Sequence, residues 1–115
     1  MIAYKLVRKA SDNKLYPLFI DRKREYKFCE QRQAEFIPTK GFAPRIGFHC
    51  CFTPYAPHLK THLKSGEDRV WVECEIEDFK TYERPESQGG KWILANHIVV
   101  NRELSFEEVD KILKG

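Results

Sequence analysis

Alternating apolar and polar residues predict that this chain folds mainly into β-strands. Within Arg69–Phe79, the even-numbered positions from Val70 to Ile76 are apolar, while the odd-numbered positions hold Trp71 and three glutamates. A period of two places the apolar set on one face of an extended strand. The segment Trp92–Asn101 is apolar on both faces, which is typical of a strand in the centre of a sheet.

The N-terminal part predicts a β-hairpin and further short strands. Tyr4–Lys9 and Lys14–Ile20 have strand-like patterns, and Ser11–Asn13 between them contains residues that favour a tight turn. Ile46–Phe52 is rich in apolar and aromatic residues and predicts a short buried strand. Tyr26–Phe28 is too brief to distinguish a strand from a turn of helix.

Two segments rich in turn residues or polar residues are expected to be loops. Phe36–Arg45 contains two prolines and a glycine and should cross the sheet as a loop. Lys80–Lys91 separates two predicted strands and is longer than the connections typical of hairpins, which favours a mobile or a functional loop.

Helix signals occur at two places. Thr53 and Pro54 could open a helix, and Ala56–Lys64 is expected to be a short helix that ends at Ser65 and Gly66. Near the C-terminus, Ser105 and Glu108 have the spacing of a capping box, and an apolar stripe follows. The stripe consists of Val109, Ile112 and Leu113.

The sum of these elements is an α+β fold: a small antiparallel or mixed β-sheet with one or two short helices packed on it. The 115 residues suffice for one domain with a modest core, and residues 1–115 are expected to form that single domain. The apolar fraction of 42% and the charged fraction of 32% are ordinary for a globular protein.

Composition and charge narrow the classes of partner. The chain holds no apolar run of the roughly 18–20 residues that a membrane span needs, and its first residues lack the apolar region of a signal peptide. We therefore expect a cytoplasmic protein without a membrane partner. A net charge of +3 makes a nucleic-acid partner the weakest expectation. The uneven charge, with a basic run at Arg22–Arg24 and acidic residues in Glu73–Asp78, suits a small anion.

Four cysteines are expected to be free thiols, because nothing indicates secretion. Cys50 and Cys51 are neighbours on a predicted strand and should point to opposite faces, so they should not bond to each other. A catalytic thiol beside His49 is an alternative, although adjacent positions on a strand do not orient an attack. Burial of the cysteines in the core is the competing interpretation.

Residues 41–62 contain three of the four histidines, two cysteines and three prolines, and the histidines and cysteines form a dense group of side chains able to bind metal, protons or phosphate. His58 and His62 are four residues apart and would share one face of a helix, so a zinc site with Cys51 is conceivable. No second ligand pair has metal-binding spacing. We expect neither a metal nor another cofactor.

The segment Gln88–Lys91 indicates an anion site. Two consecutive glycines, Gly89 and Gly90, could expose backbone N–H groups to phosphate, Lys91 would add a positive charge, and Trp92 would offer a stacking face. A flexible turn is the alternative interpretation. Tyr55, after the predicted strand at Ile46–Phe52, could stack on a planar ligand. The predicted ligand-binding set is Arg45, His49, Tyr55, His58, Arg84, Gln88, Gly89, Gly90, Lys91 and Trp92.

Two blocks of the sequence resemble small uncharacterised proteins of bacteriophages and prophages. They consist of RIGFHC at Arg45–Cys50 with the following TP and APH, and of RVWVE at Arg69–Glu73 through RPESQGGKW at Arg84–Trp92 to Arg102–Leu104. The resemblance covers most of residues 41–104. It implies a phage or prophage origin and a compact sheet-based domain, and it brings no known catalytic set.

Three interpretations of function follow. The first is a non-catalytic binding protein that sequesters a phosphorylated or nucleotide-derived signalling ligand as a host-defence antagonist. A second subunit would then complete the pocket, because one small domain offers little depth. The second is an ADP-ribosyl-transferase-like or nucleotide-hydrolysing enzyme, which rests on analogy of layout. The third is a protein–protein inhibitor of a host factor. No catalytic residue is assigned.

Overall fold

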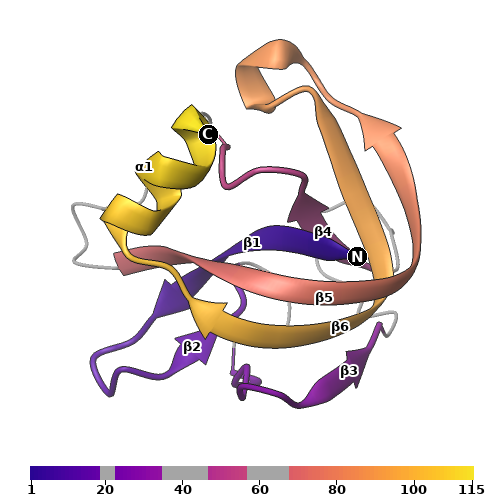
Figure 1. Cartoon of the computed structure of the whole chain (residues 1–115). Helices are drawn as coiled ribbons and strands as arrows, with labels where there is room; N and C mark the ends of the chain where they lie inside the picture. Colours follow the sequence, from indigo (N-terminus) through magenta and orange to yellow (C-terminus); the bar gives the residue numbers. More distant parts are fainter. Residues whose placement is uncertain (19–22, 35–46, 57–67) are drawn as a thin grey trace.

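The computed structural model describes residues 1–18, 23–34, 47–56 and 68–115, and the strands in this part form one antiparallel sheet (Figure 1). The strands are β1 (Ile2–Lys9), β2 (Leu15–Tyr16), β3 (Gln31–Gln33), β4 (Phe48–Cys51), β5 (Asp68–Glu83) and β6 (Lys91–Glu103). The sequence left open an antiparallel or a mixed sheet, and every pairing between the described strands is antiparallel.

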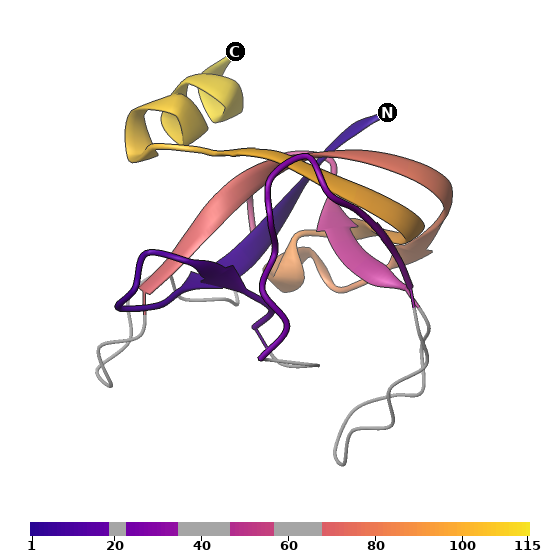
Figure 2. The ribbon, with the colours of Figure 1, turned by 90° about the horizontal axis from the view of Figure 1, so that it is seen from below.

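The sheet closes on itself through four of its strands. β1 pairs with β5, β5 with β6, β6 with β4, and β4 returns to β1 at the pair Tyr4 and Cys51. β2 extends the sheet beside β1, and β3 extends it beside the far part of β6. Figure 2 shows how strongly β5 and β6 curve to permit this closure.

Several sequence predictions are confirmed by these pairings. The N-terminal hairpin exists as β1 and β2, with Asn13 in a left-handed conformation at its turn and the Asp12 carboxylate accepting the Lys14 N–H at 2.9 Å. The strand predicted at Ile46–Phe52 is β4. The segment predicted to be a central strand is β6, which pairs with β3, β4 and β5.

The prediction of a loop across Lys80–Lys91 is wrong. β5 continues to Glu83 and β6 begins at Lys91, so that Lys80 pairs with Leu94 and Tyr82 with Trp92. The connection contains the short 3-10 helix η1 (Glu86–Gln88). The sequence pattern did not predict this part of the hairpin, because its polar residues lack the apolar alternation of a buried strand.

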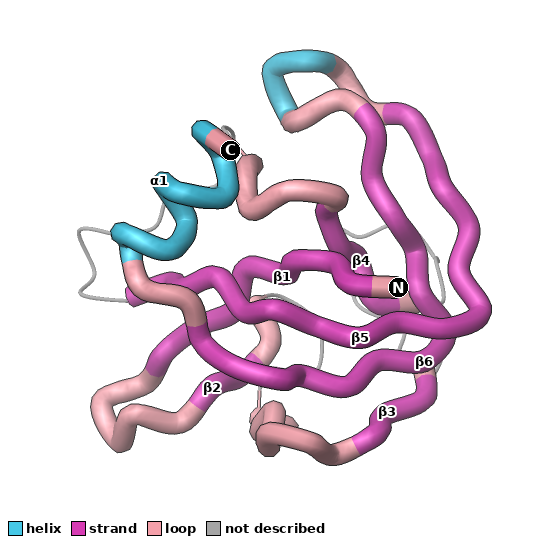
Figure 3. The backbone as a smooth tube through the Cα atoms, in the orientation of Figure 1, coloured by secondary structure: helices cyan, strands magenta, loops and turns pink. Residues whose placement is uncertain are grey.

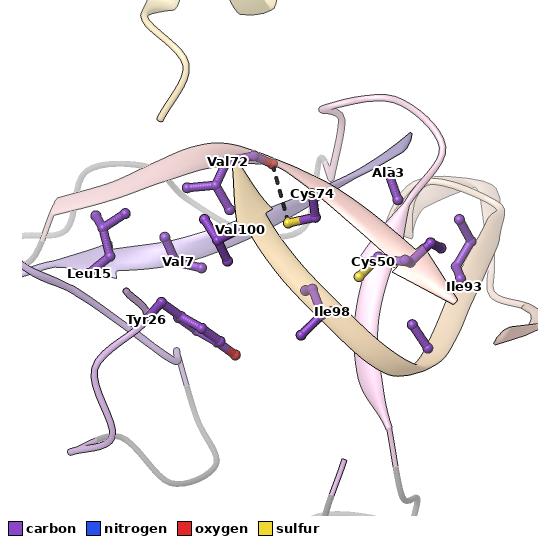
Figure 4. Close-up of a cluster of buried hydrophobic side chains, with 12 residues drawn as sticks. Ala3, Val7, Leu15, Tyr26, Cys50, Val72, Cys74, Ile93, Ile98 and Val100 are labelled. Carbon is purple, nitrogen blue, oxygen red and sulfur yellow. Dashed lines mark hydrogen bonds between the residues drawn. The ribbon is translucent and has the colours of Figure 1, made fainter. Parts of the chain in front are cut away.

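Two groups of buried side chains lie on the two faces of the sheet. The first, called here the main core, is shown in Figure 4. Its members are Ala3, Val7, Leu15, Tyr26, Cys50, Val72, Cys74, Ile76, Ile93, Ala95, Ile98 and Val100. The second, called here the aromatic cluster, consists of Leu6, Leu18, Cys51, Ala56, Trp71, Trp92 and Leu104. The separation of Cys50 from Cys51 confirms that neighbouring strand residues point to opposite faces.

The alternation predicted for β5 is confirmed up to Asp78. Val72, Cys74 and Ile76 enter the main core, and Trp71 is buried on the other face in the aromatic cluster. Asp78 has a positive φ of 51°, and beyond it an even-numbered residue, Tyr82, packs against the aromatic cluster. The parity of the β5 side chains that face the aromatic cluster therefore changes across Asp78.

Figure 3 shows the C-terminal helix α1 (Phe106–Lys114). The capping box that the sequence predicted holds its N-terminus. The Ser105 hydroxyl accepts the Glu108 N–H at 3.1 Å, and the Glu108 carboxylate accepts the Ser105 N–H at 3.1 Å. Val109 and Ile112 pack against the aromatic cluster, whereas Leu113 of the predicted stripe is 45% exposed. The helix therefore covers one side of this cluster.

Two remaining predictions concern the segments around residues 36–64. Phe36–Arg45 lies outside the described residues, as does nearly all of the predicted helix Ala56–Lys64. Thr53 and Pro54 are described, and they form a bend rather than a helical turn. Among the described residues, no helix is long and apolar enough to cross a membrane.

Candidate functional site

The two segments that the sequence singled out meet in the structure. β4 pairs with β6 so that Cys51 lies opposite Trp92, and the chain then runs on to Tyr55. A Cβ atom added to Gly89 would lie 3.3 Å from the Tyr55 carbonyl oxygen, so the turn of the β5–β6 hairpin touches this stretch. We call Phe48–Ala56 together with Lys80–Trp92 the hairpin corner.

His49 and Tyr82 form the best-defined polar contact of the hairpin corner. His49 Nδ1 lies 2.6 Å from the Tyr82 hydroxyl, and the two rings are nearly perpendicular with centroids 5.7 Å apart. Both residues are partly buried. The contact spans β6, since His49 on β4 is opposite Leu94 and Tyr82 on β5 is opposite Trp92.

A glycine makes room beside this contact. Gly47 has a φ of 141°, and a Cβ atom there would lie 2.6 Å from Leu94 Cγ. Leu94 shares the face of His49, so a larger residue at position 47 would displace the side chain next to the imidazole. Tyr82 is not among the predicted site residues, because it lies in the segment Lys80–Lys91 that the sequence predicted to be a loop. If the strand is continued past Phe79, Lys80 and Tyr82 fall on one face, and this spacing could have indicated that Tyr82 belongs to the site.

Trp92 anchors the hairpin turn rather than offering a bare stacking face. Its Nε1 donates to the Gln88 carbonyl oxygen at 2.7 Å, and only 5% of its surface is exposed. The Arg84 guanidinium lies 4.9 Å from the Trp92 ring centroid, and its Nε donates to Gln88 Oε1 at 2.9 Å. Arg84, Gln88 and Trp92 of the predicted set are thus brought together, with Arg84 covering the indole.

The two glycines of the turn adopt the left-handed region, with φ of 98° at Gly89 and 77° at Gly90. Gly89 N–H donates to the Glu86 carbonyl at 3.0 Å, and Gly90 N–H donates to the Pro85 carbonyl at 3.2 Å. Both groups are therefore engaged within the turn. A phosphate at this place would meet side chains and not the open N–H groups on which the sequence prediction rested.

The exposed groups of the hairpin corner are aromatic and charged. Tyr55 is 52% exposed and Phe52 43% exposed. Lys80 and Lys91 are exposed cations, and Glu83 and Glu86 supply opposite charge at the same turn. An aromatic ring, three cations and an imidazole paired with a phenol are the chemical groups that this corner can present to a ligand. The third cation is Arg84. Arg45 and His58 of the predicted set lie outside the described residues.

The cysteine thiols on β4 and β5 are unsuited to nucleophilic chemistry. Burial raises the pKa of Cys50 to about 11 and that of Cys51 to about 12, and it also raises the pKa of Cys74. A thiol with so high a pKa is almost entirely protonated at neutral pH and reacts slowly. Cys29 is exposed, and all four cysteines are free.

Metal ligands do not gather in the part of the chain that the structure describes. No group of three or more histidine, cysteine or carboxylate side chains there could hold a metal ion. The conceivable zinc set of Cys51, His58 and His62 includes two histidines outside the described residues.

Known proteins give no further guide to this site. Comparison of the chain with protein-family models, with curated proteins and with solved structures gave no match.

Proposed function

We propose that this protein is a non-catalytic binding protein that holds a small phosphorylated or nucleotide-derived ligand at the hairpin corner. The observation that carries the proposal is that the backbone of an exposed aromatic residue, Tyr55, meets Gly89 in the turn of the β5–β6 hairpin, which also carries Arg84 and Lys91. A nucleotide combines a planar base with anionic phosphates, and these two parts call for an aromatic surface and for cations.

The charges of the corner support an anionic ligand of limited size. Arg84 is fixed by Gln88 and by the face of Trp92, so its guanidinium is already oriented before any ligand arrives. Preorganisation of this kind lowers the entropic cost of binding. Lys91 beside the turn adds an exposed positive charge. Glu83 and Glu86 oppose a large polyanion, which agrees with the low net charge of +3.

The biological setting that we propose follows from the resemblance to phage and prophage proteins. A small phage protein that holds a nucleotide signal of the host would act as a host-defence antagonist by removing that signal from solution. A second copy of the chain would deepen the shallow corner, so we propose that the binding form is a homo-oligomer.

The test is a thermal-shift and calorimetry panel of cyclic dinucleotides and ADP-ribose derivatives on the purified chain. At least one ligand should raise the midpoint of unfolding, and Tyr55→Ala should abolish the rise. Phe28→Ala is the matched control, because Phe28 is also 52% exposed and lies outside the hairpin corner. Absence of stabilisation by every member of the panel, in a folded sample, would count against the proposal. Light scattering with and without the ligand reports the oligomeric state.

A second candidate, an enzyme acting on a nucleotide, is favoured by the His49–Tyr82 contact. An imidazole held at 2.6 Å from a phenol is a positioned proton donor and acceptor, as general acid–base catalysis requires. Recovery of the ligand after long incubation separates the two candidates. Turnover that His49→Ala abolishes supports the enzyme, and unchanged ligand supports the binding protein.

A further inference from the structure

The distal part of β5 has one edge that no described strand covers. β1 follows β5 only as far as Ile76, whose N–H donates to the Met1 carbonyl oxygen at 2.9 Å. Beyond this contact, β6 is the only described strand that pairs with β5, and Figure 1 shows this arm of the hairpin at the outer side of the sheet. Residues 77–81 are all exposed, and they include a large apolar side chain, Phe79, with an exposed fraction of 41%.

Backbone alternation shows which groups of this edge point away from β6. The Arg84 N–H donates to the Gly90 carbonyl oxygen at 2.7 Å, so the backbone groups of Arg84 face β6. Successive residues of an antiparallel strand direct their N–H and C=O groups to alternate sides. Those of Thr81 and Glu83 are therefore directed outward, as are those of Phe79.

The outward edge has a defined length. Asp78, with its positive φ of 51°, interrupts the regular strand at one end. Pro85, which has no N–H, follows the strand at the other end. The remaining segment, Phe79–Glu83, is an edge of the kind that adds a further strand by backbone hydrogen bonds.

Charge selects one register for the pairing of this edge with the same edge of a second copy. Hydrogen-bonded pairs join outward-directed residues, so a symmetric antiparallel pairing has its centre at one residue of the segment. A centre at Lys80 would place two lysines directly opposite each other, and a centre at Tyr82 would place Lys80 opposite Arg84. A centre at either end of the segment would leave most of the edge uncovered. Thr81 is the remaining centre.

We propose that two copies of this chain pair through the outward edge of β5, antiparallel and with the two-fold axis at Thr81. About six backbone hydrogen bonds would form along the edge. Phe79 would lie opposite Glu83 of the second copy and be covered by its stem, and Asp78 would approach Arg84 of the second copy, which has the opposite charge. This interface rests on the homo-oligomer of the proposed function, and it places each copy beside Arg84 in the hairpin corner of the other.

The test is an exchange of charge at the two-fold axis, measured by sedimentation without any ligand. The wild-type chain should form a dimer at concentrations up to about 1 mM. Thr81→Lys and Thr81→Glu each place like charges opposite each other and should raise the dissociation constant at least about fivefold. An equimolar mixture of the two variants should recover the dimer. Gln31→Lys, at an exposed position of β3, is the matched control and should behave as the wild type.

A disulfide cross-link tests the position of the axis. The Cα atoms of a hydrogen-bonded antiparallel pair lie about 5.5 Å apart, within the range that a disulfide spans. Thr81→Cys in a Cys29→Ser background should therefore form a disulfide between two chains on mild oxidation. Gln31→Cys in the same background should stay reduced under these conditions.

A wild-type chain that remains monomeric at about 1 mM would overturn the interface. A dimer that both charge variants leave intact would overturn it as well. If the charge variants fail to fold, the cross-link decides, and no more disulfide at Thr81→Cys than at Gln31→Cys refutes the pairing. Nucleotide binding by a monomer would overturn the interface alone, whereas a dimer that binds no member of the ligand panel would overturn the ligand site alone.

Discussion

His49 and Tyr82 meet above β6, 2.6 Å apart, although their strands β4 and β5 do not pair with each other. Their contact links the strand that enters the hairpin corner to the arm of the hairpin that forms its wall. Both side chains extend over the intervening Leu94 and Trp92, which occupy the same face of β6. The contact therefore fixes the orientation of the only imidazole described in this corner.

Tyr82→Phe should destabilise the fold by about 1 kcal/mol, because it removes one partner of a partly buried hydrogen bond. The free energy of unfolding from denaturant titration measures the loss. Tyr55→Phe is the matched control: its ring is half exposed, and removal of its hydroxyl should change stability by less than about 0.5 kcal/mol. Equal effects of the two substitutions would contradict a structural role for the His49–Tyr82 contact.

Gly89→Ala should be more destabilising than Gly90→Ala. Both positions have a left-handed backbone, which costs a non-glycine residue about 1 kcal/mol. At Gly89 the added methyl group would also lie 3.1 Å from Trp92 Nε1 and 3.3 Å from the Tyr55 carbonyl oxygen, whereas at Gly90 it would meet no atom within 4 Å. The total loss at Gly89 should therefore reach about 2–3 kcal/mol.

The difference between these two alanine variants isolates the contact that assembles the hairpin corner. The unfolding midpoints of both variants measure this difference in stability. Ligand titration of the same samples shows whether the hairpin corner still binds. Indistinguishable midpoints for Gly89→Ala and Gly90→Ala would mean that the turn does not rest on the Tyr55 backbone.

Glu108 should make the stability of the fold dependent on pH in the acid range. The pKa of Glu108 is lowered from its ordinary value of 4.5 by the hydrogen bond from the Ser105 N–H and by that from Arg102. A group with a depressed pKa in the folded state stabilises that state above its unfolded pKa, and the contribution is lost as the pH falls through the folded value. Glu108→Gln should therefore lower the unfolding midpoint at pH 7 and have little effect well below pH 4.5.

Glu108→Gln should also weaken the link between α1 and the sheet. The Arg102 guanidinium binds Glu108 of α1 and also Glu73 of β5, the latter at 3.3 Å. The unfolding midpoint of Glu108→Gln as a function of pH is the measurement. Glu107→Gln serves as the control because Glu107 lies in the same first turn without a role in the capping box. If the difference in unfolding midpoint between Glu108→Gln and the wild type stays constant from pH 7 to acid pH, Glu108 is not the source of the pH dependence.

Thiol titration should find one fast-reacting cysteine in the native protein. Cys29 is exposed, whereas burial raises the pKa of Cys50, Cys51 and Cys74 and shields their sulfur atoms. Cys29→Ser should remove the fast phase with Ellman's reagent at pH 8 and leave the three slow thiols, which react on unfolding. Two or more fast equivalents in the native wild type would show that the strands open more readily than their burial indicates.

The sequence predicted those parts of the fold that depend on local pattern. The alternation of Val72, Cys74 and Ile76, the N-terminal hairpin and the capping box at Ser105 each arise from residues close together in the chain. The closure of the sheet at Tyr4 and Cys51 could not be predicted, because it joins strands that are far apart in sequence. Local patterns carry no information on such pairings.

The same limit applies to the hairpin corner. The sequence pattern predicted a site at His49, Tyr55 and the turn around Gly89, and the structure places Gly89 beside the Tyr55 backbone and His49 beside Tyr82. The sequence pattern did not point to Tyr82, because polar neighbours made the arm of the hairpin resemble a loop. The pattern also predicted that Trp92 is available to a ligand. Only 5% of this side chain is exposed, because it packs among residues of β1, β4 and β5. Such burial is a property of tertiary packing.

The ring of strand pairings has a consequence for how the chain acquires its structure during synthesis. β1 is made before the other described strands, yet its longest pairing is with β5, in which Ile2 lies opposite Glu75, and β5 appears only after more than half of the 115 residues have been made. Until then, among the described strands, β1 can pair only with the short β2 and, at Tyr4 and Cys51, with the short β4. β5 and β6 are contiguous and can form their long hairpin as soon as both have emerged. We expect the nascent N-terminal half to depend on chaperones until the β5–β6 hairpin has formed and pairs with it.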